Sequence, residues 1–149
     1  MTGRVPLTGG CLCGAIRYEA DVAPDWVAYC HCRMCQKALG SIFGVFAGFP
    51  GSAFRYVKGE PTHYRSSPWA RRGFCPACGS SLDFWLQDDP DPAVTVATFD
   101  RPEDWPPDLY HTGIEGKVPW HRIADDLPQR TSDASPYVKG AKRKLGIAD

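Results

Sequence analysis

Seven cysteines stand in three short groups along a chain of 149 residues. Thiolate sulfur is a preferred ligand of Zn²⁺, and sulfurs that share one tetrahedral zinc ion lie within about 4 Å of one another. Two cysteines close in sequence come that near only in a tight turn, or at positions i and i+2 of an extended segment. The spacing inside each group allows this. The groups are Cys11-Leu12-Cys13, Cys30-His31-Cys32-Arg33-Met34-Cys35 and Cys75-Pro76-Ala77-Cys78.

The first and third groups are each followed by a glycine, Gly14 and Gly79, whereas the middle group is followed by Gln36. A glycine at that position can take a positive φ angle, which lets backbone N–H groups point at the sulfurs. We therefore assign these two groups to one structural zinc site with four thiolate ligands, joining two distant segments of the chain. The predicted ligands are Cys11, Cys13, Cys75 and Cys78.

Cys30, Cys32 and Cys35 remain. Structural zinc sites are closed by four ligands and catalytic sites keep one position open, so three leftover thiolates favour a catalytic zinc and two zinc ions per chain. Two alternatives stay open: a histidine closes the second site, or the thiols form a reactive cluster without metal. An iron–sulfur cluster fits less well, because no group matches the usual ferredoxin spacings. The histidines available to close the site are His31, His63, His111 and His121.

Composition limits the classes of protein to which the chain can belong. Hydrophobic residues make up 43% and charged residues 23%, which is ordinary for a globular domain and excludes a wholly disordered or fibrous chain. The 17 basic and 17 acidic residues cancel, which argues against a nucleic-acid partner. The sequence has no apolar core of a signal peptide and no run of about 18 apolar residues. We therefore expect no membrane segment and a cytoplasmic protein whose thiols stay reduced.

Hydrophobic and polar residues alternate along much of the chain, which predicts a mainly β fold with short helices. One helix is expected at Met34–Leu39, with Gly40 as its C-cap. The proline-rich segment Arg101–Asp108 is expected to be irregular. A single domain is predicted over residues 1–130, and the polar, basic stretch 131–149 is an extension, either docked or loose. The predicted strands are Ile16–Val22, Val27–Tyr29, Ile42–Phe49, Phe54–Lys58, Thr62–Arg65, Leu82–Leu86 and Val94–Phe99.

Three segments around the cysteines resemble the family of glutathione-dependent formaldehyde-activating enzymes, which is grouped with the centromere protein V domain. These segments are Gly9–Tyr18, Cys30–Lys37 and Phe74–Leu82. A weaker similarity covers Lys117–Trp120 and Asp126–Pro128. The resemblance implies a single-domain, Mss4-like zinc-containing β fold. It also implies a structural zinc on the first and third cysteine groups, and a catalytic zinc on the middle group with a position open to a thiol substrate.

The activity implied by the resemblance is that of a carbon–sulfur lyase similar to S-(hydroxymethyl)glutathione synthase. Glutathione or a similar small thiol would add to formaldehyde or another small carbonyl compound, or the reverse reaction would occur. Zinc suits this chemistry, because it deprotonates a bound thiol or polarises an aldehyde oxygen. The alternative is a non-catalytic, zinc-stabilised module that binds a small molecule or a protein. The oligomeric state is left open.

Two further sets of side chains are candidates for contact with a substrate. Aromatic residues near the cysteine groups either line a pocket or belong to the core. They are Phe43, Phe46, Trp69, Phe74 and Trp120. Cations beside the cysteine groups are either solvated or bind substrate carboxylates. They are Arg33, Lys37, Arg71 and Arg72.

Overall fold

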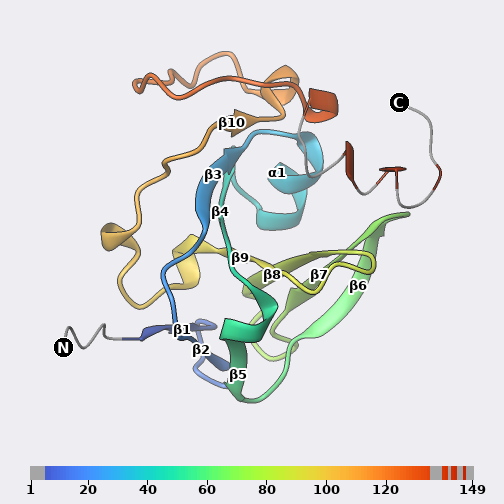
Figure 1. Cartoon of the computed structure of the whole chain (residues 1–149). Coiled ribbons are helices and arrows are strands. Elements are labelled where there is room, and N and C mark those ends of the chain that lie inside the picture. The colour runs from blue at the N-terminus through green and yellow to red at the C-terminus, as the bar shows by residue number, and fades with distance from the viewer. Residues whose placement is uncertain (1–5, 135–138, 141, 144–145, 147–149) are drawn as a thin grey trace.

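Short strands in two sheets make up most of the regular structure (Figure 1). The computed structural model describes residues 6–134, 139–140, 142–143 and 146, so part of the predicted extension 131–149 lies outside the described residues. The smaller sheet is antiparallel, with the order β1-β2-β5. Its strands are β1 (Leu7–Gly10), β2 (Arg17–Ala20) and β5 (Phe54–Lys58).

The larger sheet has the order β10-β3-β4-β9-β8-β7-β6. Only β10 runs parallel to its neighbour, β3, and the other pairs are antiparallel. The fold is therefore mainly β, as predicted. The strands are β3 (Trp26–Cys30), β4 (Gly44–Gly48), β6 (Thr62–Ser67), β7 (Ala70–Phe74), β8 (Ser81–Leu86), β9 (Ala93–Thr95) and β10 (His111–Thr112).

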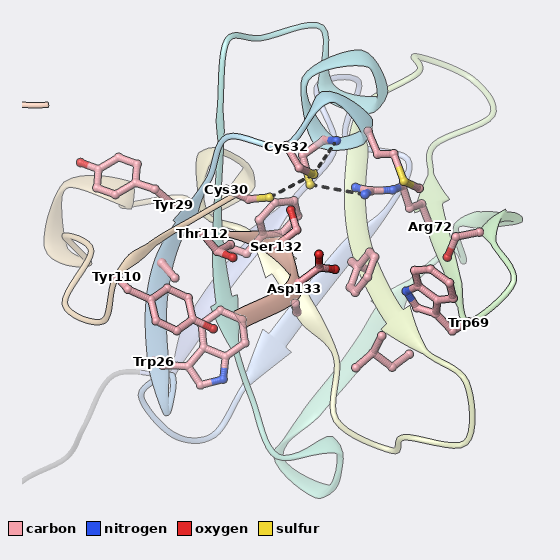
Figure 2. A pocket seen from close by; sticks show the side chains of 18 of the residues that line it. Trp26, Tyr29, Cys30, Cys32, Trp69, Arg72, Tyr110, Thr112, Ser132 and Asp133 are labelled. Atoms are coloured by element: carbon pink, nitrogen blue, oxygen red, sulfur yellow. Dashed lines mark hydrogen bonds between the residues drawn. The ribbon is translucent and has the colours of Figure 1, made fainter. Parts of the chain in front are cut away.

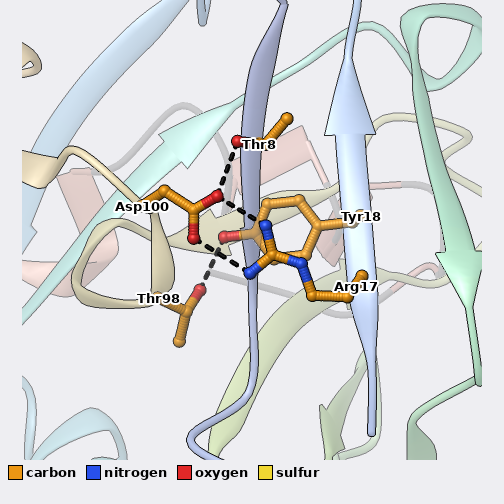
Figure 3. Close-up of polar contacts among 5 residues, drawn as sticks. All are labelled: Thr8, Arg17, Tyr18, Thr98 and Asp100. Atoms are coloured by element: carbon orange, nitrogen blue, oxygen red, sulfur yellow. Dashed lines mark hydrogen bonds and ion pairs between the residues drawn. The ribbon is translucent and has the colours of Figure 1, made fainter. Parts of the chain in front are cut away.

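The main core lies between the two sheets. Val27, Ala47 and Val94 come from the larger sheet and pack with Tyr18 and Phe54 of the smaller one. Tyr18 is fully buried, and its hydroxyl lies 2.7 Å from the Thr98 hydroxyl, which supplies the hydrogen bond that a buried phenol needs (Figure 3). Because side chains alternate across a strand, residues next to those of the core face the opposite side of the larger sheet, where a pocket lies.

Helix α1 (Arg33–Leu39) follows β3 directly. Its N-cap is Cys32, whose sulfur accepts a hydrogen bond from the backbone N–H of Cys35. Gly40 ends the helix with φ 64°, as predicted. Figure 1 places α1 and β10 at one end of β3 and β4, and the smaller sheet at the other. None of the helices among the described residues is long and apolar enough to cross a membrane.

The secondary structure differs from the expectations, because one predicted strand continues as a 3-10 helix and three strands, β1, β7 and β10, were not predicted. The strand predicted at Val94–Phe99 ends at Thr95, and Val96–Thr98 forms a 3-10 helix, η2. The Thr98 hydroxyl donates to the carbonyl of Thr95 at 2.8 Å, and such local bonds compete with a strand ladder. Strand β7 was missed, because its sequence Ala-Arg-Arg-Gly-Phe lacks an alternating pattern, yet β6 and β8 pair with it on both sides.

Other single-turn 3-10 helices lie in connecting segments, one of them in the segment expected to be irregular. They are η1 (Gly51–Ala53), η3 (Pro102–Asp104), η4 (Ile114–Gly116) and η5 (Ser132–Ala134).

Candidate metal centres and the adjoining pocket

The turn after β1 and the turn after β7 bring four cysteines together. The sulfurs of Cys11, Cys13, Cys75 and Cys78 all lie within 4.8 Å of one another. The Cys11 and Cys13 sulfurs are 3.6 Å apart, and the Cys13 and Cys75 sulfurs are 3.8 Å apart. Four sulfurs bound to one tetrahedral zinc at about 2.3 Å stand roughly 3.8 Å from one another. We call these residues the four-cysteine cluster, and its donor atoms and spacing fit zinc.

Both turns of the four-cysteine cluster have the backbone expected from the sequence. Gly14 has φ 81° and Gly79 has φ 80°, values that side chains other than glycine rarely tolerate. The Ile16 N–H donates to the Cys11 sulfur at 3.3 Å. At Cys78, hydrogen bonds from the hydroxyl and the backbone of Ser80 lower the pKa of the thiol to about 5. The turn at Cys78 therefore favours the thiolate, the form that binds a metal.

A second cluster forms where β3 passes into α1. Its sulfurs, from Cys30, Cys32 and Cys35, lie within 4.8 Å of one another, and those of Cys30 and Cys32 are 3.3 Å apart. We call it the three-cysteine cluster. No histidine, aspartate or glutamate among the described residues joins it. It therefore offers a metal three protein ligands and leaves one tetrahedral position for another molecule.

Protons are shared unequally in the three-cysteine cluster. Hydrogen bonds from Cys30 and Cys35 lower the pKa of Cys32 well below that of a free thiol. The same contact with Cys32 raises the pKa of Cys30 well above that of a free thiol. A metal ion bound here would displace the remaining protons, because only thiolates coordinate it.

The candidate histidines lie elsewhere. His31 is buried on the side of β3 away from the three sulfurs, and its Nε2 is 2.8 Å from Nδ1 of His111. The Nε2 of His111 is 3.0 Å from the Asp125 carboxylate. Burial and then the neighbouring His111 lower the pKa of His31 to about 4, so it is neutral at neutral pH. His121 packs against the His31 ring, and His63 is bonded to a buried carboxylate of β8. The contact between His31 and His111 joins the end of β3 to β10, whereas the contact of His63 joins β6 to β8.

Only one of the four candidate cations reaches the three-cysteine cluster. Arg72 of β7 is 3% exposed, and its Nη2 donates to the Cys35 sulfur at 3.4 Å. Its guanidinium also lies 4.9 Å from the centre of the Phe84 ring. A solvated surface position for this residue is therefore excluded. The other three cations are exposed and do not line the pocket: Arg33, Lys37 and Arg71.

A cavity of about 250 Å³ opens onto the three-cysteine cluster. Figure 2 shows the sulfurs and Arg72 at one side of this pocket, with large rings around the rest of its wall. These rings come from β3, β4, β8 and the loops beside them. They belong to Trp26, Tyr29, Phe46, Trp69, Phe84 and Tyr110.

Some pocket residues were expected and others were missed. Phe46 and Trp69 line the pocket, whereas Phe43 and Phe74 do not, and Trp120 is 73% exposed. The sequence could have identified Trp26 as a lining residue. Trp26, Ala28 and Cys30 stand at alternate positions of one strand, so their side chains share one face of the sheet. Nothing local marked a further group of lining residues, which come from segments near the C-terminal end of the described chain. They are Tyr110, Thr112, Ser132, Asp133 and Lys142.

Comparison with known proteins finds a solved structure of similar fold and relatives of similar sequence. A solved structure of a Rhodobacter sphaeroides protein shares the fold, with a TM-score of 0.52 and 22% identity, covering 82% of this chain and 98% of that one. A putative glutathione-dependent formaldehyde-activating enzyme of Halomonas elongata is 30% identical over 131 residues, covering 78% of this chain and 80% of the relative.

An uncharacterized lyase of Schizosaccharomyces pombe is 35% identical over 78 residues. This match covers 51% of the chain and 55% of the yeast protein, so it spans about half of that relative. The family model of the glutathione-dependent formaldehyde-activating enzyme matches residues 6–112, which contain both cysteine clusters. The chain therefore belongs to the family of glutathione-dependent formaldehyde-activating enzymes.

Proposed function

We propose that this protein is a zinc-dependent carbon–sulfur lyase that joins a thiol to a small carbonyl compound, or splits the product. The single observation that carries the proposal is the three-cysteine cluster at the wall of a pocket. Family membership and the lyase name of the yeast relative support a lyase. A purely structural metal site would need no cavity beside its ligands.

In the proposed holoenzyme, the four-cysteine cluster holds one zinc ion and Cys30, Cys32 and Cys35 hold another. Zinc at the second site would lower the pKa of a bound substrate thiol, so that the thiolate is present at neutral pH. With three protein thiolates and one substrate thiolate bound to Zn²⁺, the site would have a net charge of −2. The guanidinium of Arg72, 3.4 Å from the Cys35 sulfur, offsets part of this excess.

The reaction needs a hydrogen-bond donor for the carbonyl oxygen, because that oxygen gains charge as the sulfur attacks. Thr112 lines the pocket and pairs in register with Cys30. Its buried Oγ1 has no hydrogen-bond partner among the described residues. We assign this hydroxyl to the carbonyl oxygen. The sulfur–carbon bond forms as the carbonyl π bond breaks, and the oxygen takes up one proton from water, which replaces the proton that the thiol released on ionisation and gives a hemithioacetal.

Replacement of a ligand in the second cluster tests the proposal. Cys32→Ser should lower the zinc content from two ions to one per chain and remove the catalysed formation of hemithioacetal from a thiol and formaldehyde. Metal content is measured by elemental analysis of anaerobically purified protein, and the rate by NMR exchange.

Arg71→Ala is the matched control, because Arg71 is exposed and stacks on Trp85 outside the pocket. It should keep two zinc ions and the full rate. If wild-type protein holds one zinc and loses none with Cys32→Ser, the open site is absent and a non-catalytic module replaces the lyase.

A further inference from the structure

Most of the surface of the pocket wall is apolar. Aromatic rings and aliphatic side chains from four strands of the larger sheet face the space next to the three sulfurs (Figure 2). Phe46, Phe84 and Leu86 are buried or half-buried and pack in the clusters beneath this wall. A volume of about 250 Å³ is small even for a small-molecule site, for which about 300 Å³ is a lower bound. The space therefore suits a compact, uncharged group.

Charged side chains in this wall are already engaged. Among the described lining residues they are Arg72, Asp133 and Lys142. The Lys142 ammonium lies 3.2 Å from the Asp133 carboxylate, so its charge is balanced. Arg72 is directed at the Cys35 sulfur and covered by the Phe84 ring. The buried Nε of Arg72 has no hydrogen-bond partner among the described residues. The charge of Arg72 nevertheless faces the sulfurs of the three-cysteine cluster and that of Lys142 faces a carboxylate, so neither cation carries an unbalanced charge for a carboxylate of a ligand.

Glutathione carries two carboxylates and one ammonium group at neutral pH. Burying such a charge without a partner costs several kcal/mol, because the apolar wall replaces none of its hydration. An aromatic or branched aliphatic group has no such cost, and gains about 25 cal/mol for each Å² removed from water. A wall of this composition therefore favours a thiol with an uncharged, apolar group over a thiol with charged groups.

We propose that the pocket selects a neutral, apolar thiol, with an aromatic or branched aliphatic group of about benzyl size, over the glutathione tripeptide. This inference rests on the proposed function, since it names the thiol that the lyase accepts. The thiol sulfur takes the position left open by the three cysteines. Its apolar group packs between Trp69 and the rings of Trp26 and Phe84.

Substitution of Trp69 tests whether the apolar group of the thiol packs against this ring. It is half-buried in the turn between β6 and β7, and its ring also contacts the Lys142 ammonium, 6.0 Å from the ring centre. A turn position tolerates substitution better than a core strand. Trp120, which is 73% exposed and outside the pocket, gives the matched control.

Isothermal titration of the zinc-loaded protein with benzyl mercaptan, 2-mercaptoethanol and glutathione provides the measurement. Benzyl mercaptan should bind at least about 10-fold more tightly than glutathione. Trp69→Ala should weaken benzyl mercaptan by about 10-fold and leave 2-mercaptoethanol unchanged, since the small thiol does not reach the ring. Trp69→Phe should restore most of the loss, and Trp120→Ala should behave as wild type.

The outcomes separate the inference from the proposed function. If glutathione binds as tightly as benzyl mercaptan, the selectivity inference is wrong and the lyase proposal stands. If Trp69→Ala weakens all three thiols equally, the ring does not select the apolar group, and the inference is also wrong. If none of the three thiols binds wild-type protein, the open site itself fails and both proposals are overturned.

Discussion

At the scale of single residues, the three-cysteine cluster owes its shape to three different backbone positions. Cys30 ends a strand, Cys32 caps a helix and Cys35 lies in the first turn of that helix. The Cys32 sulfur accepts the N–H of Cys35, a bond that a serine or aspartate makes in most N-caps. One side chain therefore serves helix α1 and the candidate metal site together.

Thr112 gives a prediction at this scale. Thr112→Val keeps the size of the side chain but removes the hydroxyl assigned to the carbonyl oxygen. We expect kcat for hemithioacetal formation to fall by about 100-fold, the effect of losing one such donor, with KM for the thiol little changed. Thr112→Ser should recover most of the rate. Equal loss of rate in both variants would assign Thr112 a packing role only.

At the scale of elements, one ion pair ties the smaller sheet to the chain beyond β9. The Arg17 guanidinium of β2 donates to both carboxylate oxygens of Asp100, at 2.9 and 2.5 Å, and the Thr8 hydroxyl of β1 donates to the same group at 2.6 Å (Figure 3). The hydrogen bond from Arg17 is the main reason that the pKa of Asp100 lies below its usual value. The pair therefore joins segments that are 83 residues apart.

This pair predicts a pH-dependent contribution to stability. Because the pKa of Asp100 is lower in the folded state than in the unfolded chain, the stabilisation is present at neutral pH and is lost as the pH falls below the ordinary carboxyl range. Asp100→Asn should lower the free energy of unfolding at pH 7 by about 0.5–1 kcal/mol, a modest value because both side chains are partly exposed.

Urea unfolding at pH 7 and at pH 3 measures this difference, which should shrink at the lower pH. Asp104→Asn is the control, since Asp104 pairs on the surface with Arg101, three residues away, and joins no distant segment among the residues that the structure describes. A loss of stability that is the same at both pH values would mean that the carboxylate charge plays no part.

At the scale of the whole molecule, the four-cysteine cluster connects the two sheets. Cys11 and Cys13 follow β1 of the smaller sheet, and Cys75 and Cys78 lie between β7 and β8 of the larger one. A metal ion there would link two distant segments, since Cys13 and Cys75 are 62 residues apart in the sequence. Such a link restrains the unfolded chain strongly, whereas the three-cysteine cluster restrains only a local turn.

The two clusters should therefore differ in their effect on stability. Cys13→Ser should lower the melting temperature by about 10 °C, which corresponds to roughly 3 kcal/mol for a domain of this size. Cys32→Ser should lower it by only a few degrees. Scanning calorimetry of both variants, with zinc content measured on the same samples, checks this contrast. Similar melting temperatures for the two variants would contradict the division into a structural and a catalytic site.

The local features of this protein follow from short stretches of its amino-acid sequence. Glycines after two cysteine pairs specify turns with positive φ, and these turns bring the four sulfurs together as expected. Alternation along β3 places His31 opposite Cys30 and Cys32, and Gly40 ends the helix. Each of these features depends on interactions between residues close in the chain, so their physical cause is visible in a short stretch of sequence.

The pocket, in contrast, is built by contacts between segments that are far apart in the chain. Arg72 stands beside Arg71 in the sequence, yet one is buried against a sulfur and the other is exposed, because β7 turned out to be a strand whose two faces differ. Thr112 meets Cys30 through a parallel pairing of β10 with β3. Such contacts join segments far apart in the chain, and their energy comes from packing and desolvation that no local pattern encodes.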